Sequence, residues 1–215
     1  MSEKLIHGNL TQKYNTKNVL HRLLMNNFIH SFHHLLDAHV ENDISSICEI
    51  GCAEGELLKI VREKFPSAEL HACDLSPEEI LKAQNNCEGL DVHFSIQDAQ
   101  NLSAYQISQF DLVICCEVLE HLPKPISGLL ELERITSQHL LISVPNEPTW
   151  SILNLLRGKY FKDRGNTPGH LNHWNKKRFN EFLNRAKNIR VVSSKFPFPW
   201  QMNLLSKGVR ENKNT

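Results

Sequence analysis

The stretch SICEIGCAEGELLKIVREKFPSAELHACD, residues 46–74, sets out the fold in three steps. Residues 46–51 form a short apolar run, residues 54–65 place apolar side chains at helical spacing, and residues 69–74 form a second apolar run. A strand, a helix and a second strand at this interval predict a βαβ unit with parallel strands and a right-handed crossover.

The same alternation continues to residue 145. It predicts a helix over 77–87, a strand over 91–98, a strand over 110–116, a helix near 126–137 and a strand over 139–145. Five such near-continuous apolar strands are typical of a sheet covered on both faces. We therefore expect an α/β fold, a Rossmann-like, doubly wound and mostly parallel sheet with helices on both faces.

The flanking segments are predicted to complete one domain over residues 1–215. Apolar residues three and four apart in 18–36 predict a helix within an N-terminal helical segment, 1–40, that precedes the core, 44–145. Residues 146–174 are irregular and rich in proline and glycine, which favours a functional lid. The last part, 175–207, is predicted to hold a helix over 175–186 capped by Asn175 and strands over 189–196 and 201–207.

Charge and cysteine usage limit the class of protein. Lys plus Arg and Asp plus Glu number 24 each, so we expect neither a membrane nor a nucleic-acid partner. The first residues lack the apolar core of a secretion signal, and no apolar run approaches the roughly 18 residues that cross a bilayer. The six cysteines include no C-x-x-C pair, which favours buried free thiols and a cytoplasmic location.

The ends of the predicted strands carry the candidate binding residues, because ligands of doubly wound sheets collect there. Gly51 and Gly55 follow the first strand and allow a tight turn into a helix N-terminus. Asp74 ends the second strand, where a carboxylate can hold a ribose, and Asp98 ends the third, where it can accept from an exocyclic amine. The loop is not the G-x-G-x-x-G of NAD and FAD binders, and no phosphate loop occurs.

The ordered motifs EIGCAEG, CDLS, QDA and FDLVICCEVLEHL resemble those of the class I S-adenosylmethionine-dependent methyltransferases over residues 44–145. The resemblance implies that S-adenosylmethionine is the cofactor. Its methionine end would then contact Glu49, Gly51, Cys52 and Gly55, and its ribose would contact Asp74 and Leu75. Its adenine would contact Asp98 and Ala99, and its sulfonium would contact Cys116 and Glu117. Tyr14 is expected to close the site from the N-terminal side. Ala53 stands where the family usually has a glycine, and its methyl group is expected to affect the affinity for the cofactor rather than the identity of the cofactor.

Glu117, Glu120 and His121 are spaced i, i+3 and i+4, so a helical turn after the fourth strand would present all three side chains on one side, facing the methyl group. Neutral His121 then serves as the base for a hydroxyl acceptor. Alternatively, the three residues form a half-site for Mg²⁺, Mn²⁺ or Zn²⁺, completed by His170 or His173. A third interpretation is purely structural: the charge of Glu120 stabilises a helix N-terminus through the helix dipole, and His121 packs against its neighbours.

The E-x-x-E-H element is similar to that of the ubiquinone-pathway O-methyltransferases and, paired with a lid histidine, of the small-RNA 2′-O-methyltransferases. We therefore expect an enzyme that methylates a small-molecule acceptor on oxygen, with residues 146–174 shaping the acceptor pocket. The alternatives are methylation of an RNA terminal ribose, a non-catalytic S-adenosylmethionine-binding partner subunit, and a nicotinamide oxidoreductase that uses Asp74 for its ribose.

Overall fold

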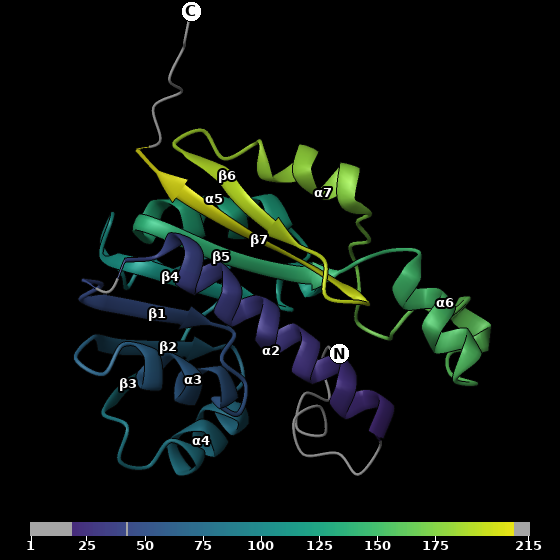
Figure 1. Ribbon diagram of the computed structural model, residues 1–215, viewed down its shortest axis with the longest axis horizontal. Helices are drawn as coiled ribbons and strands as arrows, with labels where there is room; N and C mark the ends of the chain where they lie inside the picture. The colour runs from purple at the N-terminus through teal and green to yellow at the C-terminus, as the bar shows by residue number, and fades with distance from the viewer. Residues whose placement is uncertain (1–18, 42, 209–215) are drawn as a thin grey trace, which may run out of the picture.

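The computed structural model describes residues 19–41 and 43–208, which form a mixed sheet flanked by helices (Figure 1). The seven strands have the order β3-β2-β1-β4-β5-β7-β6. The bounds are β1 Ser46–Ile50, β2 Glu69–Asp74, β3 Val92–Ile96, β4 Phe110–Cys116, β5 Thr136–Pro145, β6 Ile189–Lys195 and β7 Trp200–Lys207. The first five strands are parallel, and β7 runs antiparallel to both β5 and β6.

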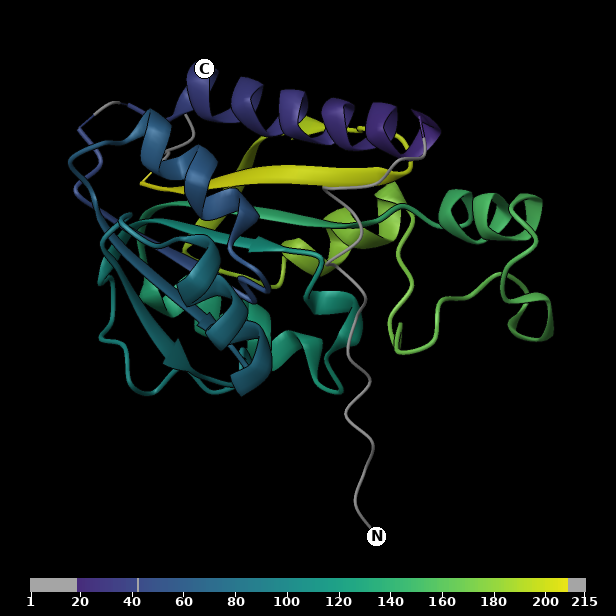
Figure 2. The ribbon, with the colours of Figure 1, turned by 90° about the horizontal axis from the view of Figure 1, so that it is seen from below.

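Helices cover both faces of this sheet, as the apolar strands predict. α2 (Val19–His39), α3 (Glu56–Lys64) and α4 (Pro77–Asn86) pack on one face, and α5 (Pro125–Ile135) and α7 (Lys176–Leu183) on the other. Figure 2 shows α2 lying along the sheet, where it contacts β7. The prediction of a doubly wound, mostly parallel α/β fold is confirmed.

The strand order reverses between β1 and β4, because β2 and β3 lie on one side of β1 while β4 and β5 lie on the other. The loops that leave the carboxyl ends of β1 and β4 diverge at this point and leave room for a ligand. No helix within residues 19–41 and 43–208 is both long and apolar enough to pass through a membrane.

The structure corrects three local predictions. Residues 146–174 are not wholly irregular, since they contain α6 (Thr149–Leu156) and the short 3₁₀ helix η2 (Phe161–Asp163); both views show α6 beyond the end of the sheet. α5 ends at Ile135 and β5 begins at once, because Thr136 already pairs with Phe110. The apolar stripe of α2 is buried only from Met25 onward; Leu20 and Leu23 are 53% and 60% exposed.

Two smaller predictions are confirmed. All six cysteines are free and buried. The side chain of Asn175 accepts a hydrogen bond from the backbone N–H of Arg178, at 2.9 Å, and so caps α7.

Candidate functional site

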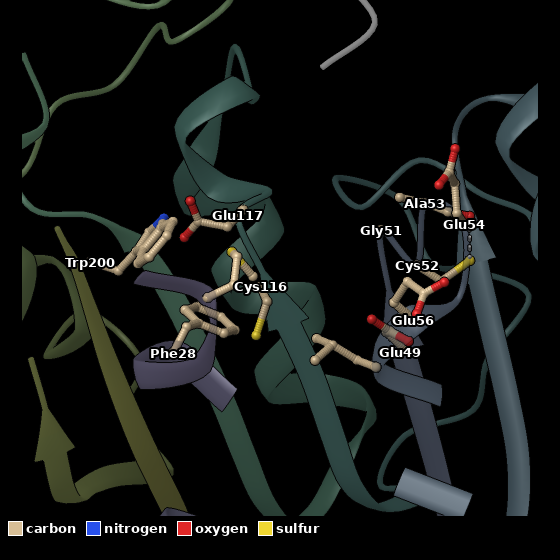
Figure 3. A pocket seen from close by; sticks show the side chains of 12 residues that line it. Phe28, Glu49, Gly51, Cys52, Ala53, Glu54, Glu56, Cys116, Glu117 and Trp200 are labelled. Carbon is tan, nitrogen blue, oxygen red and sulfur yellow. Dashed lines mark hydrogen bonds between the residues drawn. The ribbon is translucent and has the colours of Figure 1, made fainter. Parts of the chain in front are cut away.

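A pocket with about 530 Å³ of empty space lies at the reversal point of the sheet. Figure 3 shows Phe28 and Trp200 on one side of it and the loop after β1 on the other, with Cys116 and Glu117 between them. The lining residues come from α2, the end of β1, the loop into α3, the end of β4 and the start of β7: Met25, Phe28, Glu49, Gly51, Cys52, Ala53, Glu54, Glu56, Leu57, Cys116, Glu117 and Trp200.

The loop after β1 has left-handed backbone at Gly51 (φ 75°) and at Ala53 (φ 45°). The N–H of Gly51 donates to the carbonyl of Cys73 at 2.7 Å, and a Cβ at Gly51 would lie 2.3 Å from Cγ2 of Val118. Only glycine therefore fits the first position. Ala53 keeps the left-handed conformation with a side chain, and its N–H donates to Oδ2 of Asp74 at 3.0 Å.

Glu49 brings a buried carboxylate to the pocket wall. It is 3% exposed, and its Oε2 has no hydrogen-bond partner within the described part of the chain. Burial, together with the negative charge of Asp74, raises the pKa of Glu49 well above its usual value. A cation placed beside this carboxylate would stabilise its ionised form.

The charge of the pocket has one sign. Its lining residues include the four carboxylates of Glu49, Glu54, Glu56 and Glu117, and none of the described lining residues is a lysine, an arginine or a histidine. Lysines outside the lining pair with two of these carboxylates, Lys59 with Glu56 at 3.0 Å and Lys82 with Glu54 at 3.8 Å, whereas Glu49 forms no ion pair within the described residues. A cation in the pocket would therefore be drawn chiefly to Glu49. The pocket thus fits a ligand that carries positive charge, as the ammonium and sulfonium groups of S-adenosylmethionine do.

The remaining candidates at the ends of β2 and β3 lie outside the pocket lining. Asp74 accepts from the N–H of Ser76 at 2.9 Å through Oδ1 and from Ala53 through Oδ2, which leaves one lone pair on each oxygen for further donors. Asp98 accepts from the N–H of Gln100 at 2.8 Å.

The other predicted cofactor residues are placed as follows. Leu75 is 51% exposed and Ala99 is 8% exposed. Gly55 caps α3 with φ 78°, and a Cβ there would lie 2.6 Å from Sγ of Cys87. Tyr14 lies outside the described residues.

Glu117 adopts the left-handed conformation, with φ 60°, so the chain does not turn helical directly after β4. Its N–H donates to the carbonyl of Ser143 at 3.0 Å, and the Ser143 hydroxyl donates to Glu117 Oε1 at 3.0 Å. These bonds hold the carboxylate on the pocket wall. The 3₁₀ helix η1 then spans only Leu119–His121, and neither Glu120 nor His121 is among the lining residues.

Glu120, His121 and His170 form a separate cluster whose potential ligand atoms lie within 4.8 Å of one another. The prediction that Glu117 shares one side of a helical turn with Glu120 and His121 is therefore wrong, because the left-handed residue turns Glu117 toward Ser143 instead. His173 also lies apart from the cluster, with its Nδ1 3.6 Å from Oε1 of Glu147.

The tautomer of neutral His121 is fixed by a backbone carbonyl. Its Nδ1 lies 2.9 Å from the oxygen of Gly169, which can only accept, so Nδ1 carries the hydrogen and Nε2 carries the lone pair. Nε2 lies 3.9 Å from Oε1 of Glu120, and the rings of His121 and His170 are 4.9 Å apart. The cluster therefore offers a carboxylate and imidazole nitrogens, a donor set suited to a divalent cation.

Aromatic packing joins the pocket to this cluster. Ring centroids are 5.3 Å apart for Phe28 and Trp200, 5.8 Å for Trp200 and Trp150, and 5.9 Å for Trp150 and His170. Sequence reasoning did not single out Phe28, Trp150 or Trp200 as site residues. Helical spacing marks Phe28 only as apolar, and nothing local indicates that β7 returns beside β5.

Asn172 is a further residue that sequence reasoning missed. Its amide donates to the carbonyl of Leu122 at 2.7 Å and to that of Leu119 at 3.2 Å, and its backbone N–H donates to the carbonyl of Glu120 at 3.0 Å. The segment after α6 is thereby fastened to η1. The only sequence signal is its place between the two histidines of GHLNHW.

The comparisons with known proteins agree with this geometry. Residues 48–138 match the model of a methyltransferase domain family. The chain is 28% identical over 156 residues to the malonyl-[acyl-carrier protein] O-methyltransferase of Anoxybacillus flavithermus, covering 72% of this chain and 60% of the relative. It is 32% identical over 92 residues to the ubiquinone biosynthesis O-methyltransferase of Xanthomonas axonopodis pv. citri, covering 42% of this chain and 38% of the relative.

Solved structures show the same fold. The magnesium protoporphyrin IX methyltransferase of Synechocystis PCC 6803 with bound SAH has a TM-score of 0.68 at 18% identity, over 91% of this chain and 90% of that one. The sheet, the pocket and the family match over residues 48–138 are thus similar to those of the class I S-adenosylmethionine-dependent methyltransferases. The chain spans between 38% and 60% of the length of the two curated relatives.

Proposed function

We propose that the chain binds S-adenosylmethionine in the pocket at the ends of β1 and β4 and transfers its methyl group to an oxygen of a small molecule. The observation that carries the proposal is the buried carboxylate of Glu49, whose Oε2 has no partner within the described residues, in a pocket wall without a basic side chain. An ammonium group bound there would supply the missing hydrogen bond and the opposite charge.

The rest of the cofactor would then extend along the neighbouring strand ends. Gly51, Cys52 and Gly55 would hold the methionine end, Asp74 and Leu75 the ribose, and Asp98 and Ala99 the adenine. Each Asp74 oxygen keeps a lone pair for a ribose hydroxyl. Cys116 and Glu117 would border the sulfonium, since both line the pocket between the β1 loop and the aromatic wall.

Glu117 would be the residue that meets the acceptor hydroxyl. Methyl transfer is an in-line displacement, so the acceptor oxygen must stand behind the methyl carbon and lose its proton. Glu117 is held by Ser143 at the pocket wall, where its carboxylate can accept that hydrogen bond. His121, with its lone pair on Nε2, would act as the base from the adjoining cluster.

In an alternative mechanism Nε2 of His121 is a metal ligand instead of the base, and the cluster of Glu120, His121 and His170 would hold a divalent cation, Mg²⁺ or Mn²⁺, beside the acceptor. When bound, such an ion lowers the pKa of a coordinated hydroxyl. The three residues fit the ion because their ligand atoms lie within 4.8 Å of one another. His170 is kept in place by stacking on Trp150, and His121 by its hydrogen bond to Gly169.

The pocket also favours one class of acceptor. None of the described lining residues is a lysine, an arginine or a histidine that could pair with a carboxylate or phosphate acceptor, whereas the edge-to-face pair of Phe28 and Trp200 offers an apolar surface to an uncharged ring or chain. We therefore propose an uncharged hydroxyl compound as the acceptor. In competition for labelled S-adenosylmethionine, phenolic alcohols should be methylated in preference to acyl carboxylates; preference for carboxylates would reject this acceptor class.

Thermal unfolding with S-adenosylhomocysteine tests the cofactor assignment. A ligand at 100 times its dissociation constant adds about 2.7 kcal/mol of stability, which corresponds to a Tm rise of roughly 5–11 °C for a chain of this size. Glu49→Gln should reduce that rise, since it removes the charge but keeps the shape. No rise with the wild-type protein, together with stabilisation by NADH, would reject the cofactor assignment.

The same assay separates the two mechanisms. A further shift with Mn²⁺ that a chelator reverses and that Glu120→Ala abolishes would support the metal-assisted mechanism. No response to Mn²⁺, with turnover lost in His121→Ala, would leave His121 as the base.

A further inference from the structure

A second group of potential metal ligands lies on strands β2 and β3, outside the lining of the cofactor pocket. Glu69 and His71 are on β2 and His93 is on the edge strand β3, and one ligand atom from each lies within 4.8 Å of the others. None of the three residues lines the cofactor pocket or belongs to the cluster of Glu120. We propose that these residues bind a zinc ion that joins β3 to β2.

Strand geometry brings the three side chains together. Glu69 and His71 are two residues apart on β2, so they point to the same face of the sheet. His71 pairs with His93 in the parallel register of β2 and β3, which places the two imidazoles side by side on that face. The ring centroids are 4.8 Å apart. Backbone hydrogen bonding thus fixes the positions from which the three side chains extend.

The distances between donor atoms suit a tetrahedral ion. Nε2 of His71 lies 2.8 Å from Oε1 of Glu69, a hydrogen bond in which the imidazole N–H donates to the carboxylate, and Nε2 of His93 lies 3.7 Å from the same oxygen. Binding of the ion would release this proton from Nε2 and replace the hydrogen bond by one bond from each residue to zinc. Zinc binds imidazole nitrogen and carboxylate oxygen at about 2.0–2.2 Å, which separates neighbouring donors by roughly 3.3 Å in a tetrahedron. The two distances bracket this value, so small side-chain rotations would bring the donors into place.

One ligand is anchored and two are accessible. The side chain of His71 is 19% exposed, and its ring packs against Phe110 at 5.0 Å and edge-to-face against Tyr105 at 6.3 Å. The side chains of Glu69 and His93 are 59% and 61% exposed. They border an open hollow that Asp91 and Arg62 also line, and the Arg62 guanidinium donates to the backbone carbonyls of Pro66, Ala68, Leu90 and Asp91. An ion can therefore enter from solvent and keep a water as its fourth ligand.

The choice of zinc follows from the donor set. Two imidazoles and one carboxylate prefer zinc to Mg²⁺ or Ca²⁺, which favour all-oxygen sites. The ion would link β3 to the rest of the sheet, because among the described residues β3 pairs with β2 alone. β3 leads directly into Asp98 and Ala99, so the ion would steady the segment that carries these two residues.

Isothermal titration with ZnCl₂ of the full chain, stripped of metal with a chelator, tests this site. His93→Ala should weaken binding of one zinc equivalent by at least about tenfold, and excess Mg²⁺ should not displace that equivalent. The matched control is His170→Ala, which removes a histidine from the other cluster and should leave the equivalent unchanged. Circular dichroism should show that both variants are folded.

A second readout is amide hydrogen exchange with and without zinc. The wild-type protein should show slower exchange over residues 92–96 when zinc is present, and His93→Ala should not. If His93→Ala binds zinc as the wild type does, or if His170→Ala alone abolishes binding, the proposal is rejected, and Glu69 and His71 form only a surface ion pair. Neither readout depends on methyl transfer.

Discussion

Replacement of Gly51 by alanine gives the most direct test of the loop that forms the pocket floor. Gly51 has φ 75°, and a Cβ there would lie 2.3 Å from Cγ2 of Val118. The next nearest atom, Cβ of Val118, is 3.5 Å away, which is an ordinary contact. The substitution therefore lowers the free energy of unfolding in two separable ways, through the left-handed backbone of the new alanine and through its clash with one methyl group of Val118.

The two costs are of similar size. An alanine in the left-handed region costs about 1–2 kcal/mol, reduced by several tenths because alanine also restricts the unfolded chain. Overpacking by one carbon in a close-packed region costs about 1–3 kcal/mol. Gly51→Ala should therefore lower the free energy of unfolding by about 2–4 kcal/mol, which corresponds to a Tm drop of roughly 4–16 °C.

The chain supplies the controls that separate these costs. Gly89 has φ 84° and no atom within 4 Å of its would-be Cβ, so Gly89→Ala measures the conformational cost alone. Val118→Ala removes the methyl group that clashes, so the double variant with Gly51→Ala should recover about 1–3 kcal/mol relative to the sum of the single changes.

Urea unfolding of the four variants and the wild type measures these differences. Equal destabilisation by Gly51→Ala and Gly89→Ala, with no coupling between residues 51 and 118, would refute the close contact between the β1 loop and the segment after β4.

Three further changes test other parts of the structure. Ala53→Gly should raise the free energy of unfolding in urea by about 0.5–1 kcal/mol, because it relieves the left-handed conformation at φ 45°; destabilisation would contradict this. Asp74→Ala should weaken S-adenosylhomocysteine binding by roughly 10–100-fold in calorimetry, because the ligand loses its hydrogen bonds to a charged carboxylate. His121→Ala should bind the ligand as the wild type does and lose roughly 10²–10⁴-fold in turnover. The reverse pattern would exchange the roles of the two residues. Burial alone would raise the pKa of Asp111, but hydrogen bonds from Ser45, Ser137 and Gln138 outweigh it and lower the pKa to about 2; this stabilisation is present above about pH 4 and lost as the pH falls toward 2, so the wild type should lose about 1 kcal/mol more than Asp111→Asn between pH 5 and pH 2.5 in urea titrations.

The predicted and observed elements differ where tertiary contacts impose a conformation that the local sequence pattern does not indicate. Residues 149–156 form α6 although the surrounding prolines and glycines favour an irregular segment. The amide of Asn154 in this helix donates to the carbonyl of Gly165 at 2.9 Å and to Oγ1 of Thr167 at 3.1 Å, contacts that no local pattern indicates. The prediction for Glu117 fails for another reason. Spacing of i, i+3 and i+4 describes a helix, but the backbone at Glu117 is left-handed, and its hydrogen bonds to Ser143 come from a strand 26 residues away.

The sequence by itself determined the alternation of strands and helices and the order of the cofactor motifs. Both follow from short-range physics, since apolar periodicity selects strand or helix and glycine permits the turn after β1. Tertiary structure decided which side chains meet. It placed β7 beside β5, which brought Trp200 to the pocket opposite Gly51, and it brought His170 together with Glu120 and His121. These contacts join residues far apart in the chain. The entropy lost on closing the loops between them is offset only by packing and hydrogen bonds that form together with the whole sheet.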